Sequence, residues 1–456
     1  MENANSKVIG RTRNHRLGLQ RVAILIASAG AATFGIVVDP QVGTIAVFIA
    51  GIVSLMFLSL RRTLQSALSL LWFVRVEPAP SDLLFIWAFA QRAIGGRVRK
   101  DVVIWFIPFM ALLMVNAVQL LWTLDLQRGL FFFTATSYLV GVAVLLGDSI
   151  RDTVSWSEMR DSFLWAVYVN AMVVIFLVII FILTTSNRLA PLYYAELPKE
   201  FFKAERPKGF FKDPNVAGAF SVLGVLYAES QLLFSRKRKL ALASGILSLG
   251  GVLFSFSRGA LIGMIAGLIA VGVVALVARR TFRFIALLSL VGLTTMLALP
   301  VAIEAFGQSS RFQGLTEYDV RGRFAAWQAG LQVFAEAPWG IGPGAFEKGI
   351  VSYFEEYSAH NTFLRVLVEN GLVGLLFLVL GLATVFRSAV SSIILTCRVA
   401  DRSWLADSAW LAGSLTAVLV ESWFIDTLHW RHLWVIIGLI FAHHRIMKIA
   451  ASSSNL

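Results

Sequence analysis

Two polar residues, His360 and Asn361, stand directly before a long apolar run that begins at residue 363. Histidine can accept a proton near neutral pH, and partial removal of an imidazole from water favours its neutral, basic form. An asparagine beside it can orient a hydroxyl group or fix the imidazole. The pair predicts a general base at the mouth of a membrane helix, and an anchoring histidine at the membrane interface is the plain alternative.

Several arginines are candidates for binding an anion. Arg258 lies in S-F-S-R-G-A-L between two apolar runs, where an unpaired charge costs roughly 3 kcal/mol, and a guanidinium suits bidentate contact with a phosphate. Arg321 and Arg323 open a predicted helix, where the macrodipole favours acidic residues, so a bound anion explains them better than helix stability does. Snorkelling of Arg258 and solvation of the other two remain open, and Arg311 is a weaker candidate.

Other segments add candidates for lining such a site. Asp213-Pro214 is a common signal for the start of a helix. We therefore interpret Asp213 as an N-cap and Asn215 as a lining residue. Gly342 lies at the centre of the G-I-G-P-G turn over 340–344. Charged and histidine residues near the last crossing can pair among themselves or help to bind an acceptor; they are Glu421, Asp426, His429, Arg431 and His432.

The sequence gives little support for metal or nucleotide binding. It contains no H-E-x-x-H, no Asp-x-Asp pair and no Cys/His cluster, and its single cysteine is Cys397. The phosphate-binding pattern G-x-x-x-x-G-K-[ST] is also absent. We therefore expect no metal, no cofactor and no nucleotide-sugar donor.

The composition places most of the chain in lipid. Of its 456 residues, 57% are hydrophobic and only 15% are charged, which is too apolar for a soluble protein of this length. The net charge of +13 would suggest nucleic acid in a soluble protein. Here the basic residues fall in short clusters between apolar runs, which is the positive-inside pattern, so we expect membrane lipid and not nucleic acid as a partner.

Apolar segments of membrane-spanning length predict an all-α polytopic membrane protein with about twelve transmembrane helices. With the N terminus and the C terminus in the cytoplasm, every Lys/Arg cluster falls on the cytoplasmic side. The predicted spans are 22–38, 44–60, 102–123, 129–147, 162–184, 215–234, 240–256, 259–278, 283–303, 363–386, 406–424 and 427–446.

Three parts of the chain follow from these spans. Residues 1–303 hold nine crossings and an interfacial or re-entrant segment at 64–95, for which two short crossings are the alternative. Residues 304–362 form a large outer loop, and residues 363–456 hold the last three crossings. Within the outer loop, Phe324, Trp327, Leu331 and Phe334 recur at helical spacing before Ala337-Pro338, which predicts a helical cap over the membrane domain.

The ordered motifs resemble those of the O-antigen ligase and polymerase superfamily of bacterial inner membranes. The resemblance rests on R-x-R-F-A-A-W-Q-A-G-L, P-W-G-I-G-P-G-A-F and H-N-T-F-L-R-V-L-V-E-N-G-L-V-G-L over about 320–380, and it extends through S-R-G at 257–259 and D-P-N at 213–215. His360 matches the histidine that family members need, and Arg258 with Arg321 or Arg323 matches their periplasmic arginines. Arg365 departs from the Gln or Glu of many relatives.

The resemblance implies a GT-C-like membrane enzyme of the bacterial inner membrane with a periplasmic active site. Its reaction would be metal-independent inverting transfer of a glycan from undecaprenyl diphosphate to a sugar hydroxyl of lipid A-core, completing lipopolysaccharide. A polymerase or a protein O-glycan ligase of the same superfamily is the alternative. A polysaccharide transporter or flippase is a further one, opposed by the concentration of polar candidates at one membrane face and by the lack of an internal repeat.

Overall fold

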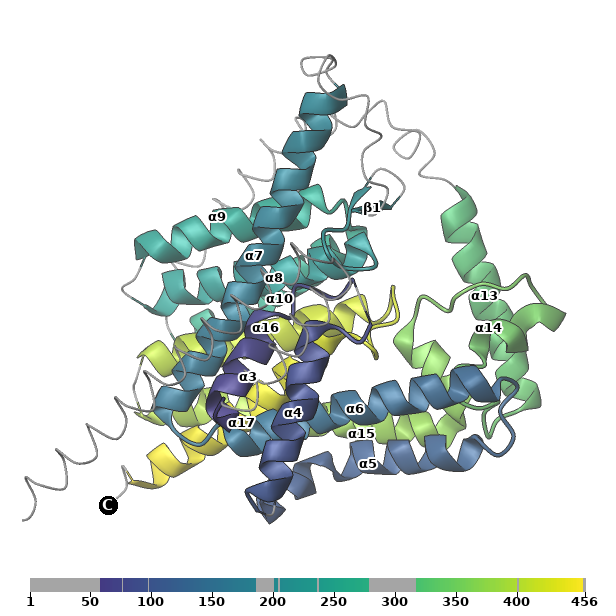
Figure 1. Ribbon diagram of the computed structural model, residues 1–456, viewed down its shortest axis with the longest axis horizontal. Coiled ribbons are helices and arrows are strands. Elements are labelled where there is room, and N and C mark those ends of the chain that lie inside the picture. The colour runs from purple at the N-terminus through teal and green to yellow at the C-terminus, as the bar shows by residue number, and fades with distance from the viewer. Residues whose placement is uncertain are drawn as a thin grey trace, which may run out of the picture. The chain divides into compact units, whose positions relative to one another are not determined.

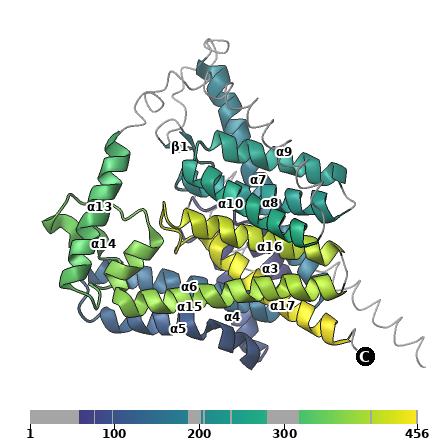
Figure 2. The same ribbon diagram turned by 180° about the vertical axis from the view of Figure 1, so that it is seen from behind.

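The computed structural model describes residues 58–75, 77–96, 98–185, 201–203, 206–235, 238–278, 317–399 and 402–453. This part of the chain is helical, apart from a short antiparallel pair formed by β1 (Phe202–Lys203) and β2 (Arg206–Pro207). Eight of its helices are long and apolar enough to cross a membrane (Figures 1 and 2). The protein is therefore an all-α polytopic membrane protein, as the sequence predicts.

Nine of the predicted spans correspond to described helices, and the spans 22–38, 283–303 and nearly all of 44–60 lie outside the described residues. The count of twelve stays a prediction. The helices are α3 (Leu60–Ser69), α4 (Pro80–Ile94), α5 (Lys100–Gln119), α6 (Leu126–Ser149), α7 (Thr153–Thr185), α8 (Pro214–Phe234), α9 (Arg238–Phe254), α10 (Arg258–Val277), α13 (Glu317–Glu336), α14 (Phe346–Gly349), the 3-10 helix η1 (Ile350–Ser352), α15 (Thr362–Val399), α16 (Arg402–Glu421) and α17 (Arg431–Ser453).

The protein divides into two compact units, residues 1–67 with 82–95 and residues 68–81 with 96–456. In the first unit, the Gln91 amide donates to the carbonyl of Leu58 over 2.6 Å. In the second unit, the backbone N–H of Val74 donates to the Phe210 carbonyl over 3.1 Å, and Glu77 pairs with Lys212 at 2.6 Å. The turn between α3 and α4 thus lies beside the segment that leads into α8. The interfacial or re-entrant placement of 64–95 stays a prediction.

Helices α8, α16 and α17 form the buried centre of the larger unit. Helix α8 packs against α9, α10 and α16, and α17 packs against α6 and α15. Most of α8 is buried, and a helix buried on all sides is apolar all round. Its Gly224 faces Ser248 of α9 so closely that a Cβ would collide with the hydroxyl. Small residues at such crossings let helices approach closely inside a membrane.

Helix α15 is longer than its predicted span and breaks at Gly371, which has φ 68° and ψ −171°. The break leaves carbonyls of the preceding turn without intrahelical partners, and the G-I-G-P-G turn supplies donors. The N–H of Ile341 donates to Val368 over 3.1 Å and that of Gly342 to Glu369 over 2.9 Å. The short helical segment 362–370 is thus separated from the long helical segment 372–399, and it is hydrogen-bonded to the turn at 340–344.

The predicted cap helix is confirmed as α13, which ends at Glu336 immediately before Ala337-Pro338. Its apolar side contacts the start of α15 through a buried cluster that includes Ala326, Ala329 and Val333. Trp327 and Phe334 are only partly buried against that cluster, and Phe324 and Leu331 are exposed. Figure 1 shows α13 and α14 at one end of α5, α6 and α15.

Candidate active site

His360 lies in the loop of residues 353–361, the His360 loop, which packs against the cap helix. Trp327 of α13 donates from its indole nitrogen to the carbonyl of Ala359 over 2.7 Å. The ring of Tyr357 stands 5.7 Å from the His360 ring, centroid to centroid, in an edge-on arrangement. His360 itself has φ 44°, a left-handed conformation that side-chain-bearing residues seldom adopt. The cap therefore fixes the backbone on which the predicted base stands.

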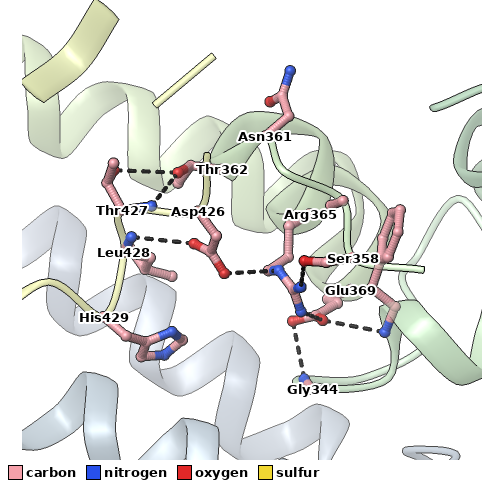
Figure 3. A network of polar contacts seen from close by, with 12 residues as sticks. Gly344, Ser358, Asn361, Thr362, Arg365, Glu369, Asp426, Thr427, Leu428 and His429 are labelled. Carbon is pink, nitrogen blue, oxygen red and sulfur yellow. Dashed lines mark hydrogen bonds and ion pairs between the residues drawn. The ribbon is translucent and has the colours of Figure 1, made fainter. Parts of the chain in front are cut away.

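Asn361 caps α15. Its side-chain oxygen accepts from the N–H of Leu364 over 2.9 Å, which satisfies one of the unpaired donors of the first helical turn. Figure 3 shows its amide turned away from Arg365. The sequence predicts a lining role for this residue, and the structure gives it a structural one at the N terminus of the helix.

The loop of residues 422–430, the α16–α17 loop, is tied to the start of α15. The N–H of Thr362 donates to the carbonyl of Ser422 over 2.8 Å. The Thr362 hydroxyl accepts from the N–H of Thr427 over 2.9 Å and donates to the carbonyl of Ile425 over 3.2 Å. These bonds place the α16–α17 loop directly beside the His360 loop (Figure 3).

Arg323 reaches the same loop from the cap. Its guanidinium donates to the carbonyl of Phe424 over 3.1 Å. Gly322, its neighbour on α13, faces the ring of Tyr357, since a Cβ there would lie 3.3 Å from that ring. The structure thus brings Arg323 into the neighbourhood of His360. Arg321, two positions earlier on α13, is exposed.

Arg258 is the first residue of α10 and is exposed. The hydroxyl of Ser257 caps this helix by accepting from the N–H of Ala260 over 3.2 Å. One turn further on, Gly263 lies against Glu421, because a Cβ there would meet the Glu421 Cγ at 2.7 Å. Glu421 ends α16 and leads into the α16–α17 loop. Arg258, Arg323 and His360 therefore come from three separate elements that all contact the end of α16 or the loop after it.

Asn215 belongs to the neighbourhood of Arg258. Arg206 donates to the Asn215 side-chain oxygen over 2.9 Å and to the carbonyl of Ser255 over 3.0 Å, so it joins the start of α8 to the turn before Arg258. The interpretation of Asp213 as a cap is confirmed, because its carboxylate accepts from the N–H of Asn215 over 2.8 Å.

Of the two remaining candidates, the structure describes only Gly342, which stands apart from this group. Gly342 is buried and has φ 97°, and a Cβ there would lie 2.5 Å from Thr123. Its contacts are with Thr123 and with the backbone of Glu369, so it supports the break in α15. Arg311 lies outside the described residues.

The sequence did not reveal the buried charge cluster centred on Arg365. Its guanidinium nitrogens lie 2.9 Å from Glu369, 2.8 Å from Asp426 and 3.2 Å from the Ser358 hydroxyl, and they also contact Glu347. The spacing of Arg365 and Glu369, four apart on a helix, was the signal available. Asp426 pairs with Arg365, whereas the sequence suggested either pairing among the charged residues near the last crossing or a role in binding an acceptor.

Two titratable groups near this cluster, His429 and Asp125, have shifted pKa values. Burial lowers the pKa of His429, although the nearby Asp426 carboxylate opposes the shift, so its imidazole stays neutral. The hydrogen bond from Lys348 lowers the pKa of Asp125. The Lys348 Nζ lies 2.7 Å from a carboxylate oxygen of Asp125. The Asp125–Lys348 pair ties the start of α6 to α14. Among the described residues, no three His, Cys, Asp or Glu side chains are grouped as metal ligands.

Residues 243–379 match the family model described as O-antigen ligase. The match covers less than a third of the chain and supports membership of the O-antigen ligase superfamily. The O-antigen ligase match contains Arg258, Arg321, Arg323 and His360, whereas Asn215 and Asp426 lie outside it. At the level of the superfamily, the match implies a glycosyltransferase-like enzyme. A comparison with curated proteins finds no matching sequence.

Proposed function

We propose that this protein is an O-antigen ligase. In this proposal it transfers a glycan from undecaprenyl diphosphate to a sugar hydroxyl of lipid A-core at the periplasmic face of the bacterial inner membrane. The supporting observation is that three elements of the matched segment meet at the end of α16 and the α16–α17 loop. Arg323 bonds to Phe424 of that loop, Thr362, just after His360, bonds to Ser422, and the helix that begins at Arg258 packs against Glu421. A base and guanidinium groups at one end of an apolar bundle suit a donor that combines a lipid tail with a diphosphate.

In the proposed reaction His360 takes the proton of the acceptor hydroxyl. The hydroxyl oxygen then attacks the anomeric carbon of the donor sugar, and the bond from that carbon to the diphosphate oxygen breaks. Undecaprenyl diphosphate leaves with the electron pair, and Arg258 with Arg321 or Arg323 stabilises the charge that grows on it. Because no carboxylate is assigned as a nucleophile, a single displacement with inversion follows.

A transfer assay tests this proposal. Purified wild type and His360→Ala are incubated with undecaprenyl-diphosphate glycan and lipid A-core, and the glycan attached to lipid A-core is measured. We expect attachment with wild type only, while donor binding is largely retained in the variant. Full activity in His360→Ala would remove the proposed base.

The same assay separates the alternatives. Elongation of the lipid-linked glycan without attachment to lipid A-core would point to a polymerase. Attachment to a protein hydroxyl would point to a protein O-glycan ligase. Chelation with EDTA should leave the rate unchanged, and inhibition reversed by one divalent cation would overturn the metal-independent mechanism.

A further inference from the structure

Arg365 is an interior guanidinium that joins four separate segments. Its side chain is 3% exposed. It contacts Glu347 of α14, Glu369 one turn further along α15, Asp426 of the α16–α17 loop and Ser358 of the His360 loop. Figure 3 shows Asp426 and Glu369 on different sides of the guanidinium, with Ser358 beside it. One side chain thus holds together loops that are far apart in sequence.

Burying these charges costs free energy, so each charge in the cluster needs a partner. Three carboxylates, Glu347, Glu369 and Asp426, surround Arg365, and Arg128 supplies a second cation at 2.8 Å from Glu347. Glu369 is also fixed by the N–H groups of Gly344 and Phe346, at 2.9 and 3.2 Å. Apolar residues often replace buried ion pairs without loss of stability. Stability alone does not explain such a cluster, and a role in fixing the loops does.

The fixed loops are those that carry His360. Ser358, which contacts Arg365, lies two positions before His360, and the N–H of Arg365 donates to the carbonyl of Asn361 over 3.0 Å. Asp426 connects Arg365 to the α16–α17 loop, which in turn bonds to Thr362, two positions after His360. The left-handed backbone at His360 persists only where its surroundings impose it. Arg365 contacts both loops directly.

We propose that Arg365 is a positioning residue. By pairing with Asp426 and binding Ser358, it fixes the position of the His360 imidazole. The inference rests on the proposed function for the role of His360, but the placement of the loop is a property of the protein with or without substrate. Arg365 touches neither donor nor acceptor in this account. It acts by holding the backbone on both sides of His360 in one arrangement.

The test compares wild type with Arg365→Gln, Ser358→Ala and Asp426→Asn by hydrogen exchange and by transfer kinetics. The structural readout is the exchange of a peptide covering 357–364, which contains the Thr362 N–H bonded to Ser422. We expect it to exchange about tenfold faster in Arg365→Gln and less markedly in Ser358→Ala, which keeps the ion pairs and hence the fold. We expect kcat to fall about 100-fold in Arg365→Gln with the donor KM nearly unchanged, because a small displacement of a reacting group has that effect.

A matched control comes from the opposite end of α16. Arg160 pairs with Asp407 at 2.9 Å, and both are largely buried, but Asp407 lies about 21 Å of helix before Glu421. Arg160→Gln should lower the unfolding temperature while leaving both kcat and exchange in 357–364 as in wild type. It thus reports the general cost of breaking a buried ion pair.

A double variant tests the connection through Asp426. Introduced alone, Asp426→Asn should reduce kcat. Added to Arg365→Gln, it should reduce kcat little further, because the two residues act through one contact. Wild-type exchange in 357–364 for Arg365→Gln and Ser358→Ala would overturn the positioning role. If exchange rises as expected but wild type transfers no glycan, the positioning role stands and the proposed function fails.

Discussion

At the scale of single residues, the two candidate arginines Arg258 and Arg323 are held differently. Arg323 is anchored, since its guanidinium bonds to the Phe424 carbonyl. Arg258 is exposed at the first position of α10, where the N-terminal end of the helix also favours an anion. In the proposed reaction, Arg258 therefore has its whole guanidinium available to the diphosphate, and Arg323 serves both the loop and the ligand.

Arg258→Ala should weaken donor binding directly. A hydrogen bond to a charged group contributes about 1.5–3 kcal/mol, so we expect the donor Kd to rise roughly tenfold to 100-fold, with a fall in kcat as well. Titration of donor into purified protein measures the Kd. Arg402→Ala removes an exposed arginine from the opposite end of α16 and should leave it unchanged. Wild-type affinity in Arg258→Ala would exclude Arg258 from the diphosphate site.

His429 makes stability depend on pH. Its ring nitrogen lies 3.1 Å from the Thr136 hydroxyl, and burial lowers its pKa against the pull of Asp426, with Arg365 adding to the lowering. The unfolded chain, with a histidine pKa of about 6.5, then binds more protons than the folded one. Stability should therefore fall as pH drops below about 6.5, by at most about 1.4 kcal/mol per pH unit from this residue.

Thermal unfolding in detergent between pH 7.5 and 5.5 measures this contribution. We compare wild type with His429→Gln, which keeps a polar group facing Thr136 and does not titrate. The variant should lose less stability on acidification than wild type. Equal losses would show that His429 takes up its proton equally in both states.

At the scale of elements, the break in α15 is the feature that shapes the site. Gly371 combines a positive φ with a close approach, since a Cβ there would lie 2.5 Å from the carbonyl oxygen of Pro338. Gly371→Ala should therefore destabilise the protein by about 2 kcal/mol or more through backbone strain and collision.

The unfolding temperature of Gly371→Ala should fall clearly below that of wild type. Gly259→Ala is the control, because Gly259 is helical and a Cβ there meets nothing nearer than the Ser257 hydroxyl, at 3.9 Å. Alanine at that position should be neutral or slightly stabilising. An unchanged unfolding temperature in Gly371→Ala would show that the break tolerates a side chain.

The length of the apolar segments and the residues typical of helix ends predicted most of the described helices. They did not predict this break. The run 363–386 reads as one apolar segment, and nothing in E-N-G at 369–371 distinguishes a broken helix from a helix that ends there. The break depends on donors from the turn at 340–344, which is remote in sequence. The cap helix was predictable because its spacing is local, whereas the exposure of Phe324 and Leu331 depends on what the helix packs against.

At the scale of the whole molecule, the predicted topology is open to a direct test. The chain has one cysteine, Cys397, which is exposed, so Cys397→Ser provides a background without thiols. Cysteines placed at the exposed positions Glu356 and Arg402 should then differ in labelling by a membrane-impermeant maleimide added to intact spheroplasts. We expect labelling of Glu356→Cys and none of Arg402→Cys until the membrane is opened. The opposite pattern would reverse the orientation.

The sequence suggests candidate residues for the site, but it does not show how they are held. His360 and Arg258 stand out in the sequence because polar residues beside apolar runs need an explanation, and Arg323 stands out because it opens a predicted helix. Arg365 was noticed only as a departure from relatives. Its pairing with Glu347 and Asp426 could not be predicted, because it depends on two loops meeting beside α15.

The ion pair between Arg365 and Asp426 also sets an order of events during biosynthesis. Ribosomes make the His360 loop and its arginine well before they make α16 and the loop that carries Asp426. Until α16 and that loop have emerged, Thr362 has no Ser422 to bond and Arg365 lacks one of its carboxylates. A nascent chain that has not yet reached the α16–α17 loop therefore lacks these contacts to the His360 loop, and the site is completed only after that loop has been made.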